Sequence, residues 1–115
     1  MSFDDIETAR IKRAMEGFLA TRRPRPDIRE QLDLGYSING QSVEIFELRP
    51  AWREPNIIVK HPAAKATYVR TQKVWKIFCM RGNLAWCRYE PKPTTPNIDE
   101  FADIVARDEY CHFFG

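Results

Sequence analysis

The spacing of hydrophobic residues predicts a helix near the start of the chain, over residues 4–21. Ile11, Met15, Phe18 and Leu19 recur at helical spacing and would share one face. Two acidic residues open the segment, where the helix dipole favours negative charge. The stretch RRPRPDIR then ends the helix, because proline cannot donate a backbone hydrogen bond.

A second helix is predicted near the C-terminal end. Asn97 precedes it, and Glu100 follows three positions later, a spacing that resembles a capping box with Asn in place of Ser or Thr. The buried stripe of this helix would consist of Ile98, Phe101, Ile104 and Val105.

Strict alternation in LDLGYSINGQSVEIF predicts a β-hairpin with one buried face. Asn39-Gly40 suits a two-residue type I′ turn, in which both residues have positive φ. Counting outward from that turn, Tyr36 lies opposite Val43 and Leu34 opposite Ile45. The hairpin therefore has a coherent apolar face.

The stretch KVWKIFCMRGNLAWCRYEP, residues 73–91, predicts a second hairpin around Gly82-Asn83, which suits a type II′ turn. In that register Cys79 lies opposite Trp86, Ile77 opposite Arg88 and Trp75 opposite Glu90. One face then carries Val74, Lys76, Phe78, Met80, Ala85, Cys87 and Tyr89. The other carries Lys73, Trp75, Ile77, Cys79, Arg81, Trp86 and Arg88.

Between the hairpins, residues 49–65 are punctuated by prolines and are expected to form a long loop. The order helix, hairpin, hairpin, helix predicts one α+β domain spanning residues 1–115. Its antiparallel sheet would have about four strands, with the N-terminal and C-terminal helices packed on one face.

Composition supports a globular, cytoplasmic protein. Hydrophobic residues make up 43% of the chain and charged residues 30%. No apolar run approaches the roughly 20 residues that cross a bilayer, and the acidic N-terminus does not resemble a signal peptide. Three cysteines, an odd number, predict reduced thiols rather than a disulfide framework.

Basic charge is concentrated in the middle of the chain, although the net charge is only +2. Residues 55–89 contain no Asp or Glu. Their basic residues are Lys60, Lys65, Arg70, Lys73, Lys76, Arg81 and Arg88. We refer to residues 55–89 as the acid-free block, and a block of this kind favours a polyanionic partner.

The acid-free block and the tryptophans of the second hairpin together suggest a binding surface for RNA or single-stranded DNA. If the helices cover the aliphatic face of that hairpin, its other face can stack unpaired bases on indole rings and hold phosphates with cations. The residues expected to bind are Lys73, Trp75, Arg81, Trp86 and Arg88.

A purely structural interpretation competes with that hypothesis. Aromatic residues are favoured in strands for packing alone. Residues 49–65, which include Trp52, could also fold over the aromatic face and bury it. The solvent exposure of Trp75 and Trp86 separates the two interpretations.

An enzymatic alternative is a metal-dependent nuclease that uses Asp33, Glu44 and Glu47. An Asp on one strand and a Glu-x-Lys on the next hold a divalent cation in nucleases of the restriction-enzyme type. Here Arg49 replaces the lysine, and the predicted register turns Glu47 away from Asp33. The pattern is therefore weak, and we assign no catalytic residue.

Cysteine and histidine positions do not predict a metal site. Cys79 and Cys87 point to opposite faces in the predicted register, and His61 falls in the predicted loop. Cys111 and His112 are adjacent, which is not the spacing of a zinc site. Phosphate-binding and dinucleotide-binding motifs are also absent from the sequence, so we expect no cofactor.

The C-terminal stretch EYCHFFG is rich in aromatic residues, which are costly to expose to water. We expect these rings to dock back on the sheet. The alternative is that they anchor a partner or a second copy of the chain, and a homodimer would then form through this tail, with Trp52 contributing.

Several blocks of the sequence resemble one family. They are RPRPDIREQLDLGY, VEIFELRPAW, KATYVRTQKVWKIF, LAWCRYEP and the closing FFG. In this order, from about Arg23 to Gly115, they are similar to the bacterial domain of unknown function family 3024. The resemblance implies a bacterial single-domain protein and transfers no catalytic or ligand-binding residue.

Overall fold

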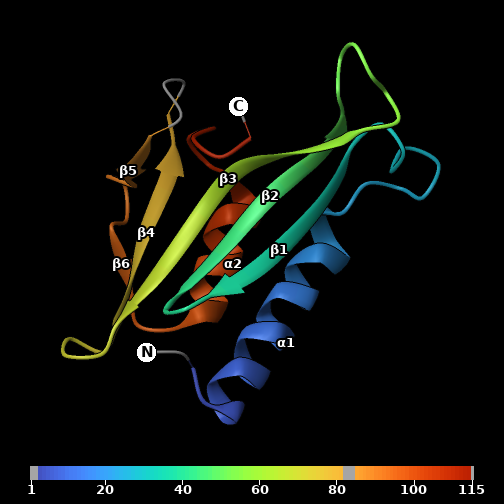
Figure 1. Ribbon diagram of the computed structural model, residues 1–115. Helices are drawn as coiled ribbons and strands as arrows, with labels where there is room; N and C mark the ends of the chain where they lie inside the picture. The colour runs from blue at the N-terminus through green and yellow to red at the C-terminus, as the bar shows by residue number, and fades with distance from the viewer. Residues whose placement is uncertain (1–2, 82–84, 115) are drawn as a thin grey trace.

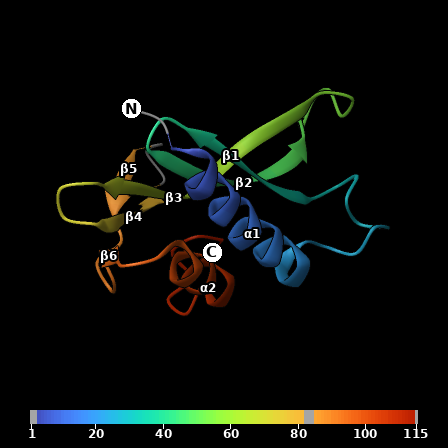
Figure 2. The ribbon, with the colours of Figure 1, turned by 90° about the horizontal axis from the view of Figure 1, so that it is seen from below.

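A computed structural model describes residues 3–81 and 85–114, and in this part of the chain two helices pack on one face of an antiparallel sheet (Figures 1 and 2). The α+β prediction, with both helices on one face, is confirmed. The elements in chain order are α1 (Asp5–Arg22), β1 (Asp33–Asn39), β2 (Ser42–Pro50), β3 (Ile58–Val69), β4 (Val74–Met80), β5 (Trp86–Arg88), β6 (Thr94–Thr95) and α2 (Ile98–Arg107).

The described strands form one sheet in the order β1-β2-β3-β4-β5, with β6 also pairing with β4. The loop predicted for residues 49–65 is wrong for most of its length, because β2 continues to Pro50 and β3 begins at Ile58. Pro62 is tolerated in β3 because the pairing with β4 starts only at Ala64. A proline needs a strand edge where no N–H is required.

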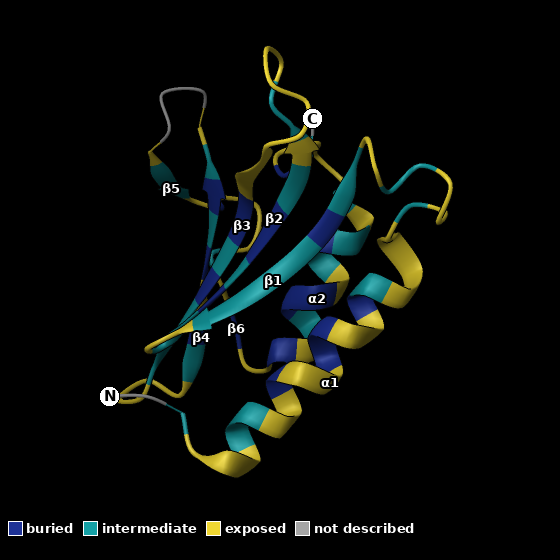
Figure 3. Ribbon diagram, turned by 45° about the vertical axis from the view of Figure 1, so that its right-hand side comes forward, coloured by how far each residue is buried: buried dark blue, intermediate teal, exposed yellow. Residues whose placement is uncertain are grey.

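The N-terminal helix is confirmed, with boundaries one residue later than predicted. Asp4 caps it: its carboxylate accepts the Glu7 N–H at 2.7 Å, and the Asp4 N–H donates to Glu7 Oε1 at 3.0 Å. Ile11, Met15 and Phe18 are buried. Figure 3 shows the buried part of α1 in dark blue. The helix ends at Arg22, before the prolines.

The C-terminal helix is also confirmed, although its cap is only half of a capping box. Asn97 Oδ1 accepts the Glu100 N–H at 2.8 Å, but the Glu100 carboxylate accepts the Thr95 hydroxyl at 2.7 Å instead of returning to Asn97. The same carboxylate pairs with Lys92. The apolar side chains of α2 fill the centre of the core, where Phe101 and Val105 are fully buried.

In the first hairpin the predicted apolar face is right, but the pairing is wrong by two positions. Tyr36 lies opposite Ile45. The turn residues are therefore Gly40 and Gln41, and Gly40 has the positive φ (58°) that favours glycine at the first position of a type II′ turn. A shift of two keeps every side chain on its face.

In the second hairpin the predicted pairing is wrong by one position. Cys79 lies opposite Cys87, and Met80 opposite Trp86. The Arg81 N–H donates to the Ala85 carbonyl at 3.0 Å, so an odd number of residues, 82–84, separates the paired ends. The predicted Gly82-Asn83 turn itself lies outside the described residues. A shift of one moves the second strand to the other face.

The helices cover the face of β4 that was expected to be open. Trp75, Ile77 and Cys79 point into the core, and Trp75 is 7% exposed. The prediction that Phe78 packs under the helices is therefore wrong. On β5 two errors compensate each other: the pairing was predicted one residue out, and the wrong face of β4 was predicted to be buried. Trp86 and Arg88 therefore lie on the side away from the helices, as expected.

Within residues 3–81 and 85–114, no helix combines the length and the apolar character that crossing a membrane requires.

Candidate functional site

The side of the sheet that faces away from α1 and α2, which we call the outer face, carries alternating rings and cations. Strand pairing assigns residues to it, because directly opposed residues in an antiparallel sheet point the same way. The aromatic and basic residues of the outer face are Phe46, Lys60, Lys65, Lys76, Phe78, Trp86 and Arg88.

One row crosses three neighbouring strands. Lys65 of β3 lies opposite Phe78 of β4, and Phe78 lies opposite Arg88 of β5. The Lys65 ammonium is 5.2 Å from the centroid of Phe78 and 4.9 Å from that of Trp86. Both rings are half-buried and Arg88 is exposed. A cation, a ring and a second cation therefore lie side by side on an accessible surface.

A second ring and cation lie further along the sheet. The Lys60 ammonium is 4.6 Å from the centroid of Phe46. Phe46 is only 8% exposed although it belongs to the outer face, because its ring packs against Gly35 of β1, which has no side chain. The Phe46 ring therefore packs under the Lys60 side chain and offers little free surface on which a base could stack.

The outer face is electropositive. Its four cations, Lys60, Lys65, Lys76 and Arg88, all come from the acid-free block. Among the described residues, none of the three lysines has a carboxylate oxygen within 4.0 Å of its ammonium nitrogen. Glu44, opposite Lys65 in β2, and Glu90, 3.2 Å from Arg88, offset part of this charge.

The five residues predicted to bind together do not share this surface. Trp86 and Arg88 lie on it. Trp75 is in the core, with its ring centroid 5.5 Å from that of Phe3 and 5.1 Å from that of Tyr68. Lys73 occupies the turn before β4, and Arg81 follows the far end of the same strand. Seven strand residues separate these two cations, a distance of more than about 20 Å.

Sequence reasoning missed Lys60, Lys65 and Phe46, and it placed Lys76 and Phe78 on the wrong side. A signal for β3 was present in the alternation of small apolar and polar residues in AAKATYV, residues 63–69. The neighbouring prolines favoured a loop and masked it.

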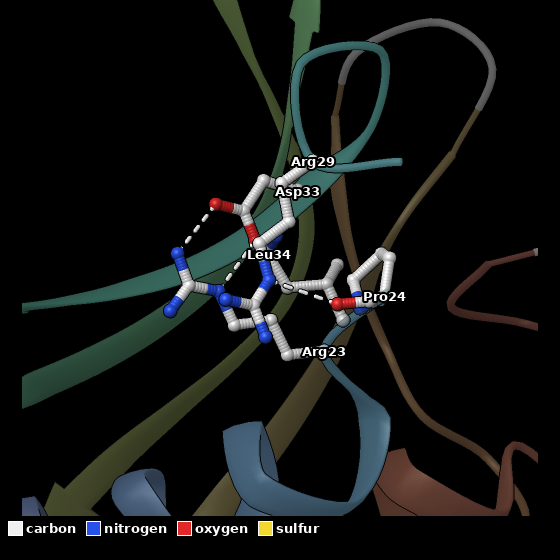
Figure 4. A network of polar contacts seen from close by, with 5 residues as sticks. All are labelled: Arg23, Pro24, Arg29, Asp33 and Leu34. Atoms are coloured by element: carbon white, nitrogen blue, oxygen red, sulfur yellow. Dashed lines mark hydrogen bonds and ion pairs between the residues drawn. The ribbon is translucent and has the colours of Figure 1, made fainter. Parts of the chain in front are cut away.

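The carboxylates of the nuclease hypothesis are not brought together. Figure 4 shows Asp33 held by Arg23, whose Nε and Nη2 donate to it at 2.7 and 2.8 Å, while the Leu34 N–H donates to it at 2.8 Å. The Arg23 guanidinium lowers the pKa of Asp33 from its ordinary value. Glu44 lies four positions along β2 from the residue opposite Asp33, a separation of about 13 Å.

Glu47 lies on the helix side of the sheet, opposite Leu34, as its predicted face requires. Within residues 3–81 and 85–114, no group of three or more His, Cys, Asp and Glu side chains could hold a metal ion.

The cysteine prediction is wrong in one respect. Cys79 and Cys87 were expected on opposite faces, but they are directly opposed and therefore point to the same side. All three cysteines are free thiols, and Cys111 is exposed. His61 lies in β3 opposite Glu47, and not in a loop.

The C-terminal tail docks back on the domain. Asp108, in the left-handed conformation, accepts the N–H groups of Phe113 and Phe114 at 3.1 and 3.0 Å. Phe113 is buried with its centroid 4.7 Å from that of Tyr89. Phe114 stacks on Phe18 of α1 at 6.5 Å. The expected docking is confirmed for Phe113 and for Phe114, whose contact is to a helix, but it is wrong for Tyr110, which is exposed.

A cavity of about 350 Å³ opens on the helix side, between α1, the start of α2 and the ends of β3 and β4. The aromatic side chains of Tyr68 and Trp75 and the basic side chains of Arg10 and Arg13 are among those that line it. The start of α2 is already capped by Asn97. This cavity is separate from the outer face.

The loop between β2 and β3 projects past the rest of the sheet (Figures 1 and 3) and does not cover the outer face. Trp52 in this loop is 87% exposed, and Ile57, at the end of the loop, and Ile58, at the start of β3, are also exposed.

Comparison with known proteins identifies the family and gives no activity. A search of curated proteins and a search of solved structures each returned no match. A family model described as a domain of unknown function, DUF3024, matches residues 3–115 and so includes α1 as well as the sheet and α2. The chain belongs to the DUF3024 family.

Proposed function

We propose that the outer face binds single-stranded nucleic acid, and that the protein acts by binding and not by catalysis. The observation that carries this proposal is the row Lys65, Phe78 and Arg88 across β3, β4 and β5, with Trp86 beside it. Rings on a sheet surface stack unpaired bases, and flanking cations contact the phosphates.

The contacts that Lys65 makes without a ligand are compatible with the binding of single-stranded nucleic acid. Its ammonium lies over Phe78 and Trp86, and an exposed cation–π contact is worth about 0.5–1 kcal/mol. One stacked base contributes about 1–3 kcal/mol. A base that displaces the ammonium from Trp86 and leaves Lys65 to contact a phosphate therefore gains more than it loses.

The surface favours unpaired over paired nucleic acid. In a duplex the flat faces of the bases are stacked on one another, so Phe78 and Trp86 could not use their rings. The phosphate contacts of Lys60, Lys65, Lys76 and Arg88 would remain, and they are independent of sequence. We expect single strands to bind more tightly than duplexes of equal length.

Fluorescence anisotropy with labelled oligo-dT, oligo-U and a DNA duplex tests the proposal. Lys65→Glu combined with Arg88→Glu should reduce affinity for oligo-U by more than about tenfold and lower the salt slope by about 0.7 for each lost phosphate contact. Trp86→Leu should weaken oligo-U binding by about 1–3 kcal/mol per lost stack and leave the salt slope unchanged.

The matched control is Lys12→Glu combined with Arg25→Glu, which changes net charge equally at two exposed positions of α1 and the segment after it. Equal weakening by the control and the outer-face variant, or no binding by the wild type at low salt, would refute the proposal. Adding Mg²⁺ or Mn²⁺ to the same oligonucleotides tests the nuclease alternative, since metal-dependent cleavage lost in Asp33→Ala would favour an enzyme.

A further inference from the structure

Cys79 and Cys87 occupy the middle position of the β4–β5 pairing. On one side of them the Tyr89 N–H donates to the Ile77 carbonyl at 2.9 Å, and on the other the Arg81 N–H donates to the Ala85 carbonyl at 3.0 Å. Bonded pairs recur every second residue in an antiparallel ladder, so the two cysteines form the bonded pair between these.

This position brings the two thiols within bridging range. The Cα atoms of a hydrogen-bonded pair are about 5.5 Å apart, and disulfides span Cα separations of about 4.4–6.8 Å. Directly opposed Cβ atoms are about 4.5–5.5 Å apart, whereas a disulfide needs about 3.8 Å. Because opposed Cβ atoms are farther apart in a hydrogen-bonded pair than in a non-bonded one, closing the bond requires them to approach by roughly 1.5 Å, which leaves the bond easier to reduce than a relaxed bridge.

The surroundings of the two thiols differ. Cys79 is 6% exposed, and burial raises the pKa of its thiol. Cys87 is half-buried at the margin of the sheet, where β5 is only three residues long. A cavity of about 280 Å³ opens beside Cys79, which lines it together with Arg81 and His112 among others. Because Cys87 is the more exposed of the two thiols, a small reagent reaches it first.

We propose that Cys79 and Cys87 form a reversible intramolecular disulfide by exchange with low-molecular-weight disulfides. The Cys87 thiolate attacks one sulfur of R–S–S–R, which forms a mixed disulfide and releases R–S⁻. The Cys79 thiolate then attacks Cys87 Sγ, the bond to the second R–S group breaks, and R–S⁻ leaves. Two cysteine protons protonate the two leaving thiolates, so two thiols are oxidised and one disulfide is reduced.

The inference is independent of the proposed function. Its structural consequence is that the bond ties the short strand β5 to β4 on the helix side of the sheet. The side chains of Trp86 and Arg88, on the outer face, keep their positions in the register.

The test uses the full chain with Cys111→Ser, which removes the exposed third thiol. The folded protein is incubated with glutathione disulfide, remaining thiols are alkylated, and the protein is digested with trypsin. Cleavage after Lys76, Arg81 and Arg88 separates the cysteines into peptides 77–81 and 82–88. We expect these two peptides to be linked, and dithiothreitol to restore both thiols.

Two variants separate the steps. Cys79→Ser should stop at a stable glutathione adduct on Cys87, and Cys87→Ser should react slowly because only the buried Cys79 remains. Two free thiols after treatment of the Cys111→Ser protein, or an unresolved adduct on it, would overturn the proposal. If Cys79→Ser fails to fold, the linked peptides and the slow reaction of Cys87→Ser still test whether the disulfide forms.

Discussion

The ring of Phe46 lies directly over Gly35 on the neighbouring strand. A Cβ added at Gly35 would come within 2.7 Å of Phe46 Cε1. We expect Gly35→Ala to lower the free energy of unfolding by about 1 kcal/mol, because the ring must tilt toward solvent and lift Lys60 with it. Urea denaturation measures the effect.

Gly17 provides the control for that substitution. A Cβ at Gly17 meets nothing within 4 Å, and the residue is exposed in α1. Gly17→Ala should therefore raise the free energy of unfolding by about 0.5–1 kcal/mol. If both alanine variants change stability in the same direction, close packing of Phe46 on Gly35 is not the cause.

Truncation of two tryptophans should change the free energy of unfolding by very different amounts. Trp75 packs between Phe3 and Tyr68 in the core, so Trp75→Ala should cost about 3–5 kcal/mol. Trp52 is exposed in the β2–β3 loop, so Trp52→Ala should stay within about 0.5 kcal/mol of the wild type. Equal costs for the two variants in chemical denaturation would contradict the assignment of Trp75 to the core.

The ion pair between Arg23 and Asp33 should make stability depend on acid pH. The guanidinium lowers the pKa of Asp33 in the folded state. The stabilisation is therefore full above the unfolded value of about 3.9 and is lost as the pH falls through it toward the folded value. The Arg23 side chain is 40% exposed, so solvent screening keeps the contribution small.

Asp33→Asn should accordingly be less stable than the wild type at pH 7 and converge with it near pH 2. Urea midpoints across this range give the measurement. Asp27→Asn serves as the control, because the Arg25–Asp27 pair is 3.6 Å apart and both side chains are highly exposed. A constant difference between Asp33→Asn and wild type at all pH values would show that the ion pair is not responsible.

The C-terminal tail should contribute to stability rather than to assembly. Phe113→Ala removes a buried ring from beside Tyr89 and should cost about 3 kcal/mol. Tyr110→Ala, at an exposed position, should cost less than about 0.5 kcal/mol. Thermal unfolding and size-exclusion chromatography, run together, distinguish the alternatives. A dimer that dissociates in Tyr110→Ala would instead favour a homodimer formed through the tail.

Elements that follow from local patterns were predictable. Both helices have one apolar stripe, a capping residue at the start and no competing arrangement, so α1 and α2 were placed to within a few residues. In β1, Leu34, Tyr36 and Ile38 are the apolar members of a strict alternation. These residues were placed on the correct face although the pairing was wrong by two positions, because the side chains of a strand alternate between its faces with a period of two residues.

The face of β4 could not be predicted from its own residues, because both of its sides are apolar enough to be buried. Trp75 and Ile77 compete there with Phe78 and Met80. Only pairing with β3 resolves the choice. Ala66, opposite Ile77, is small enough to let the helices approach, while Lys65, opposite Phe78, must keep its charge in water.

The sequence therefore encodes its helices, the apolar face of its first hairpin and its basic block in short-range patterns that can be interpreted without the rest of the fold. The composition of the candidate site depends instead on contacts between residues far apart in sequence. Lys65 and Arg88 meet on either side of Phe78 because three strands align. The pairing register of β5 with β4 determines which side chains of β5 lie beside these residues, since a shift of one residue exchanges the two faces of a strand.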